Sequence, residues 1–238
     1  QIDKVNSFKG IFTFIIILII PIMLVVSQPD LGTAILIALS GLIVVWFAGL
    51  NIKYLLYSLT ALLISMPFAI AFLKPYQKLR ILTFIDPDRD PLGAGYQIIQ
   101  SKIAVGSGGF TGKGFLKGTQ SYLEFLPEKH TDFIFTLFAE EHGFIGALFL
   151  LLIYIIIIYR VLKIGMISKS YFAKLFCFGY GSAIFFYVAV NMSMVLGLLP
   201  IVGSPLPIMS YGGSSMLATM IGFSIVMSSK IYHKQLIA

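Results

Sequence analysis

The sequence has 238 residues, of which 58% are hydrophobic and only 11% are charged. Soluble domains carry about 25% charged residues. The apolar residues of this chain are grouped in long blocks, so composition excludes a soluble globular domain and indicates a polytopic membrane protein. The formal charge of +7 does not indicate a nucleic acid partner. The basic residues are scattered at the ends of apolar blocks, where topology signals and contacts with anionic membrane lipid explain them.

Six apolar blocks approach the length of about 20 residues that a membrane-spanning helix needs. They cover residues 11–26, 31–50, 54–73, 143–159, 171–199 and 211–229, and the fourth has an alternative start at residue 133. We therefore predict an all-α membrane protein with six spans in a single transmembrane domain over residues 1–238. Cys177 lies inside an apolar run, which predicts a structural thiol, and the sequence has no Cys/His cluster of the kind that binds a metal.

The short connections between the spans indicate the orientation, because cytoplasmic loops carry an excess of Lys and Arg. If the spans alternate, one face receives the basic residues Lys4, Lys9, Lys53, Arg160, Lys163, Lys169, Lys174, Lys230 and Lys234. The short connections of the opposite face, "SQPDLG" and "PIVGSPLP", contain no basic residue. Both termini are therefore predicted to be cytoplasmic, and the long loop over residues 74–131 to be extracytoplasmic.

The long loop contains a helix-like apolar pattern at residues 96–105, followed by a glycine-rich stretch from Gly106 to Gly118. The stretch "SGGFTGKG" lacks the first Gly and the final Ser or Thr of a nucleotide-binding P-loop. Two interpretations stay open. The loop is a flap whose Lys102, Lys113 and Lys117 meet an anionic ligand, or it is a flexible, solvated segment that contacts lipid headgroups.

Five of the ten acidic residues fall within "LEFLPEKHTDFIFTLFAEEHG", residues 123–143. Asp132 has two readings: a cap at the start of a helix, or a general base whose proton affinity is raised at the membrane boundary. In the second reading Lys129 and His130 orient it or bind phosphate. On a continuous helix Glu140 and Glu141 lie about 80° and 180° around from Asp132, which favours structural roles for both.

Two further outer-face features lie near the predicted ends of spans. Asp30 in "SQPDLG" is either a cap for the second span or part of the same outer cavity as Asp132. The stretch "GLLPIVGSPLPIMSYGGSS" is too rich in Pro and Gly for a plain helix, so it must be buried in protein or line a cavity. Its exposed amides around Gly212 and Gly213 are candidates to bind an anion. Asn191 is a candidate for a hydrogen bond between helices, with no mate identifiable from the sequence.

Four stretches in order, "QPDLGTA", "DPDRDPLGAGYQIIQSKIAVGSGG", "GTQSYLEFLPEKHTDFIF" and "PLPIMSYGGSS", closely resemble the SEDS family (shape, elongation, division and sporulation) of bacterial cell-wall proteins. The resemblance implies peptidoglycan glycosyltransferase activity on lipid II in the bacterial cytoplasmic membrane, beside a class B penicillin-binding protein. It places the family's essential acid on Asp132, an outer-cavity aspartate on Asp30, and the "SYGGS" substrate-binding element on residues that include Ser210, Tyr211, Gly212 and Gly213.

The family also implies ten spans, with the large outer loop between the seventh and the eighth. The six predicted here correspond to the fifth to tenth, and the chain begins with Gln1, so we expect a fragment, a split protein or a processed form. Whether such a chain is active alone is left open at this stage.

In the mechanism that the resemblance implies, Asp132 takes a proton from the acceptor sugar while the lipid diphosphate leaves. Lys102, Lys113, Lys117, Lys129 or a divalent cation (Mg²⁺ or Mn²⁺) would stabilise the leaving charge. Two other classes remain: a flippase or transporter for lipid-linked precursors, and a non-catalytic scaffold that packs through small-residue spans. A transporter should carry ionisable residues near the bilayer midplane, whereas those of this chain gather at one interface.

Overall fold

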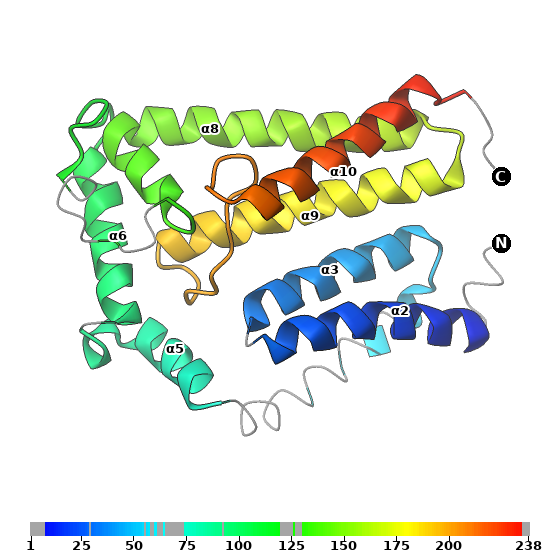
Figure 1. The fold of residues 1–238 in the computed structure, drawn as a ribbon, viewed down its shortest axis with the longest axis horizontal. Helices are drawn as coiled ribbons and strands as arrows, with labels where there is room; N and C mark the ends of the chain where they lie inside the picture. The colour runs from blue at the N-terminus through cyan, green and yellow to red at the C-terminus, as the bar shows by residue number, and fades with distance from the viewer. Residues whose placement is uncertain are drawn as a thin grey trace. The chain divides into compact units, whose positions relative to one another are not determined.

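The computed structural model describes residues 8–28, 30–54, 56–57, 60, 64, 74–91, 93–119, 126 and 130–234. Every regular element in these ranges is a helix (Figure 1), which confirms the predicted all-α class. The elements in chain order are α2 (Phe8–Ser27), α3 (Leu31–Phe47), α5 (Pro75–Ile85), the short 3₁₀ helix η1 (Pro87–Arg89), α6 (Ala94–Gly108), α8 (Ile134–Ile167), α9 (Tyr171–Val195) and α10 (Gly213–Ile231).

Within the described residues, three helices are long and apolar enough to cross a membrane: α8, α9 and α10. Shorter apolar helices cover Phe12–Ser27 and Leu31–Phe47, where the first two spans are predicted. The predicted span at residues 54–73 lies mostly outside the described residues. The predicted outer loop contains α5, η1 and α6, and the last of these covers the helix-like pattern at residues 96–105.

The chain forms two compact units, which are described separately here. Unit 1 contains residues 1–78, 161–183 and 226–238, and unit 2 contains residues 79–160 and 184–225. The predicted outer cluster of functional residues falls mainly in unit 2, with Asp30 in unit 1. That the whole chain forms a single transmembrane domain stays a prediction.

Unit 1 is built on the antiparallel pair α2 and α3, which lie side by side (Figure 1). Asp30 begins α3, and its Oδ1 accepts a hydrogen bond from the Thr33 backbone N–H at 3.0 Å, which confirms the predicted cap. The other end of α3 contacts α9. The rings of Phe47 and Phe178 stack with centroids 4.2 Å apart, and the Tyr171 hydroxyl donates to the Ala48 carbonyl at 2.7 Å.

The alternative start of the fourth predicted span, at residue 133, agrees with α8, whereas its predicted end at residue 159 is too early. α8 starts at Ile134, ends at Ile167, and is broken at Gly143, where φ is 66° and ψ is −164°. The amino-terminal part is polar enough to escape a hydropathy pattern but is largely buried in unit 2. At the other end the helix continues past Arg160 and Lys163 to Ile167, and both basic side chains are exposed.

The break in α8 leaves backbone groups without helical partners, and the loop over residues 109–119, here called the glycine loop, binds them. The N–H groups of Lys113 and Gly114 donate to the carbonyls of Glu140 and Glu141 at 3.1 and 3.0 Å. In return, Phe144 and Ile145 of α8 donate to the Gly109 and Phe110 carbonyls at 2.9 and 3.1 Å. Buried backbone groups need such partners, so this part of the loop is attached to α8 rather than freely solvated.

Glycine is required where the loop and the break meet. Gly143 and Gly112 both have positive φ, 66° and 79°, which residues with a Cβ rarely adopt. A Cβ on Gly143 would collide with the Gly112 nitrogen, and a Cβ on Gly112 would collide with the Glu141 carbonyl. The close approach of two backbones therefore depends on these two residues.

Gly143→Ala is expected to lower the free energy of unfolding by roughly 1–3 kcal/mol, because the positive φ and the contact with Gly112 both oppose a Cβ. The measurement is thermal unfolding of the protein in detergent. The matched control is Gly106→Ala in α6, where an added Cβ meets no atom within 4 Å and where Ala is favoured by about 0.5–1 kcal/mol in a helix. Equal stability of the two variants would contradict the proposed packing.

Candidate functional site

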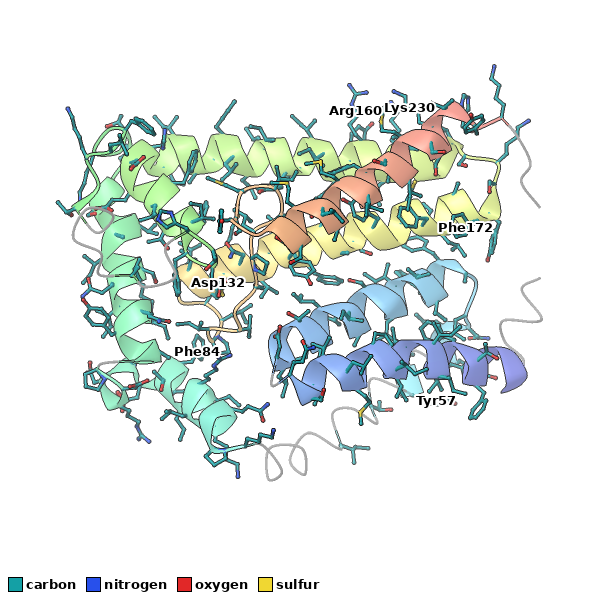
Figure 2. The ribbon with its side chains drawn as sticks, in the orientation of Figure 1. Tyr57, Phe84, Asp132, Arg160, Phe172 and Lys230 are labelled. Atoms are coloured by element: carbon teal, nitrogen blue, oxygen red, sulfur yellow. The ribbon has the colours of Figure 1, made fainter. Side chains whose placement is uncertain are left out.

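The turn that carries Asp132 is held by three consecutive backbone carbonyls, each bound by a different group. The Tyr211 N–H donates to the His130 carbonyl at 2.9 Å, and the Ser210 hydroxyl donates to the Thr131 carbonyl at 2.6 Å. The Asn191 amide donates to the Asp132 carbonyl at 2.8 Å. All of these residues belong to unit 2. Figure 2 labels Asp132 just before the short first segment of α8, residues 134–143.

These three carbonyls need outside partners because they precede the helix. α8 begins at Ile134, and the Thr136 and Leu137 N–H groups both donate to the Phe133 carbonyl. Two of the partners are buried, with 0% of Asn191 and 4% of Ser210 exposed, whereas Tyr211 contributes its backbone N–H and has an exposed side chain. A hydrogen bond shielded from water is electrostatically stronger than an exposed one, so the path of the chain through residues 130–132 is closely fixed. That Asp132 also caps α8 stays a prediction.

The α9–α10 loop, residues 196–212, supplies two of these three groups, from Ser210 and Tyr211. The loop is itself held by hydrogen bonds within unit 2. The Ser210 hydroxyl accepts from the Leu206 N–H at 2.7 Å while it donates to Thr131. The Tyr154 hydroxyl of α8 donates to the Pro207 carbonyl at 2.6 Å. Ile201, Ser204 and Leu206 are buried. This confirms the prediction that the Pro- and Gly-rich segment is not a plain helix: part of it is buried, and residues 208–213 line a groove.

The Asp132 carboxylate lies against the backbone of the same loop. A Cβ placed on Gly203 would lie 3.5 Å from Asp132 Oδ2. A larger side chain at position 203 would therefore come into contact with the carboxylate. The residue is half-buried. Asp132 therefore combines a fixed backbone with a partly solvated acid group.

A groove of about 580 Å³ adjoins the turn. Asp132 does not line it, but its neighbours His130 and Ile134 do, and the remaining lining residues are Ile208, Met209, Ser210, Tyr211, Gly212, Gly213 and Met216. Tyr211 is 81% exposed, whereas Ser210 uses its hydroxyl within the protein. The structure thus brings His130 together with the predicted anion-binding element at the start of α10.

The predicted lysines do not form one cluster. Lys102 on α6 packs its side chain over Gly197, just after the end of α9. Lys117 is exposed. Lys129 lies outside the described residues. Lys113 is engaged elsewhere, as the counterion of a buried acid.

That acid is Glu140, which is 0% exposed. Lys113 Nζ lies 2.7 Å from Glu140 Oε1, and the Thr119 hydroxyl donates to the same oxygen at 3.1 Å. Burying a carboxylate is costly unless a charge partner and hydrogen bonds compensate it, and the glycine loop supplies both. The structural interpretation of Glu140 is therefore confirmed, and it explains one member of the acidic cluster.

Asp30 belongs to unit 1, where it caps α3. Its predicted second role, in a cavity shared with Asp132, stays a prediction. In the described residues no group of three or more His, Cys, Asp and Glu side chains is arranged to hold a metal ion.

The charges of the long helices lie near their ends. Asp, Glu, Lys and Arg are absent from residues 144–159 of α8, 175–195 of α9 and 213–229 of α10. Transporters need ion sites near the bilayer midplane. The central parts of these three helices supply no charged residue for such a site.

The fold and the site define a multi-pass helical membrane protein with an immobilised acidic turn beside a groove. The chain belongs to the FtsW/RodA/SpoVE family, whose sequence profile, described as "Cell cycle protein", matches residues 3–235. This confirms the resemblance to the SEDS family.

Curated relatives and solved structures agree with this membership. The chain is 48% identical over 231 residues to "Peptidoglycan glycosyltransferase MrdB" of Escherichia coli K12, covering 97% of this chain and 62% of the relative. It is 41% identical to the protein of the same name from Helicobacter pylori J99, covering 87% and 53%. The chain thus spans about three-fifths or less of the length of these relatives.

Among solved structures, one described as "Structural coordination of polymerization and crosslinking by a peptidoglycan synthase complex" matches with a TM-score of 0.79 and 35% identity, covering 97% of this chain and 64% of the matched one. Rod shape determining protein RodA of Thermus thermophilus matches with a TM-score of 0.62 and 26% identity, covering 94% and 56%.

Sequence reasoning named Asn191 but not its partner, and it missed Gly203. The mate of Asn191 is the turn of Asp132 itself, 59 positions away along the chain. An isolated polar residue in an apolar span was the signal for Asn191, whereas a glycine among other loop glycines gave no signal for position 203.

Lys113→Met is expected to lower the free energy of unfolding by about 3–5 kcal/mol, because it leaves Glu140 buried without a counterion. Adding Glu140→Gln in the same chain should restore part of the loss, since the uncompensated charge is then removed. Lys117→Met, at an exposed lysine of the same loop, is the control and should change stability by no more than about 0.5 kcal/mol. The free energy of unfolding is measured in detergent. If the effects of Lys113→Met and Glu140→Gln simply add in the double variant, the coupling between these two residues is contradicted.

Proposed function

We propose that this chain forms the catalytic part of a peptidoglycan glycosyltransferase that polymerises lipid II into glycan strands for cell elongation and rod shape. The observation that carries the proposal is the acid of Asp132, fixed through three bound carbonyls beside a groove. The names of the curated relatives support the same reaction class. Since the chain spans only part of those relatives, the activity belongs to the complete protein that contains it.

In the proposed reaction, Asp132 accepts the proton of the acceptor sugar hydroxyl as that oxygen bonds to the anomeric carbon of the donor. The bond from this carbon to the lipid diphosphate breaks, and the diphosphate leaves with the electron pair. Attack opposite the leaving group inverts the anomeric centre. Because the donor is already activated, a single carboxylate suffices, in contrast to the pair that hydrolyses ordinary glycosides.

Charge on the leaving diphosphate needs stabilisation. The backbone N–H groups at the start of α10, at Gly212 and Gly213 in the groove, are suited to an anion, whereas Lys102 and Lys117 do not line the groove and stay candidates from the sequence alone. Lys113 contributes less in this proposal, since its ammonium group compensates Glu140. Comparison of the polymerisation rate with and without EDTA decides whether a divalent cation, Mg²⁺ or Mn²⁺, accompanies the diphosphate.

The proposal places the protein in the bacterial cytoplasmic membrane with the groove on the extracytoplasmic face. The distribution of basic residues in the short connections supports this orientation. A class B penicillin-binding protein that crosslinks the glycan product is the proposed protein partner. It is supported by the similarity to a peptidoglycan synthase complex that coordinates polymerization and crosslinking.

Asp132→Asn in the complete protein is expected to reduce polymerisation of lipid II by about 10²-fold or more, because the amide cannot accept the proton, while folding and lipid II binding persist. The measurement is glycan chain formation from labelled lipid II by protein purified in detergent. The control is Asp88→Asn, an exposed acid of η1, which should retain activity. Normal chain synthesis by Asp132→Asn would refute the assignment.

Labelled lipid II supplied only on the outer leaflet of proteoliposomes is expected to be polymerised, because the proposed site opens on that face. A flippase would instead redistribute the label between leaflets without forming polymer. Protein-free liposomes give the background rate of redistribution. Transfer of label to the inner leaflet with no glycan product would favour the transporter reading.

A further inference from the structure

We propose that Asn191 is a positioning residue for the proposed base, which it acts on through the Asp132 backbone rather than by touching the substrate. This inference rests on the proposed function, because it assigns a role within the same site. Its basis is a single buried amide that donates two hydrogen bonds. One goes to the Asp132 carbonyl at 2.8 Å and the other to the Ser204 carbonyl at 2.7 Å.

The orientation of the Asn191 amide follows from its partners. Both partners are backbone carbonyls, which can only accept, so the nitrogen with its two hydrogens must face them. A hydroxyl or a neutral imidazole has only one N–H or O–H to donate. Of the uncharged side chains, only a primary amide can bind both carbonyls from one atom.

The burial of Asn191 shows which of its atoms favours an amide at this position. The side chain is 0% exposed, and in the described part of the chain its Oδ1 accepts no hydrogen bond. An unpaired buried oxygen costs about 1–3 kcal/mol. An apolar residue would avoid that cost, so the two bonds donated by Nδ2 are the physical advantage of an amide at this position.

Those two bonds join the two sides of the site. The Asp132 carbonyl belongs to the turn that carries the carboxylate, and Ser204 follows Gly203, against which the carboxylate lies. Without the amide, the turn and the loop lose their shared partner, and the carboxylate can shift relative to the groove. A misplacement of about 1 Å is enough to cost roughly 10²-fold in rate.

The alternative is that Asn191 only stabilises the fold. A purely structural role predicts loss of folded protein with normal turnover in the fraction that remains. A positioning role predicts reduced turnover in folded protein, with substrate binding little changed, because Asn191 does not line the groove. The ratio of kcat to KM effects separates the two.

The experiment compares three variants of the complete protein with lipid II as substrate. Asn191→Leu removes both donors at similar volume and is expected to lower kcat about 10- to 100-fold with KM changed by less than about threefold. Asn191→Asp keeps the shape but loses at least one donor and should also be impaired. Asn191→Gln keeps both donors on a longer stem and should retain more activity than Asn191→Leu.

Ser101→Ala is the matched control. Ser101 is also 0% exposed and donates to a distant carbonyl, that of Val195 at 2.9 Å, but it contacts neither Asp132 nor Ser204. It should keep the wild-type kcat per folded molecule even if its melting temperature falls. Should Asn191→Leu not fold, the comparison of Asn191→Gln with Asn191→Asp decides the question.

The outcomes are distinct for the two proposals. Near-normal kcat in Asn191→Leu, or losses in all variants that follow the fraction of folded protein, would overturn the positioning role while Asp132→Asn remains inactive. Normal polymerisation by Asp132→Asn would instead overturn the proposed function, whatever the Asn191 variants show.

Discussion

The site depends on the binding of three successive carbonyls in a turn that no helix satisfies. The carbonyls of residues 130–132 precede α8, and groups from α9 and the α9–α10 loop bind them one by one. Such a constraint acts on the backbone, so it fixes where the Asp132 side chain starts without using its carboxylate. The position of the acid is therefore set by its own backbone.

The other end of the short first segment of α8 follows the same rule with different partners. The break at Gly143 exposes carbonyls and N–H groups, and the glycine loop binds both kinds. The segment between the turn and the break is therefore fixed at both ends by segments distant in sequence. Its burial follows from this arrangement, and with it the need for Lys113 to accompany Glu140.

The sequence was sufficient for the helical class and the family, because apolar block length and four ordered motifs are local properties. It also predicted the Asp30 cap and the irregular α9–α10 loop, since both follow from residue type. It left the start of α8 open between residues 133 and 143 and placed the end too early, because hydropathy does not report a helix that continues through a polar stretch. The pairing of Asn191 with the Asp132 turn depends on packing across 59 positions, which no local pattern encodes.

The attachment of the glycine loop to α8 has a mechanical consequence. Pulling the loop away would break four backbone hydrogen bonds and separate a buried carboxylate from its ammonium partner. Those losses must occur together, so the loop and the first segment of α8 will shift as one body under modest force. A protein or lipid that binds the loop would thereby displace the acidic turn at the other end of the first segment of α8.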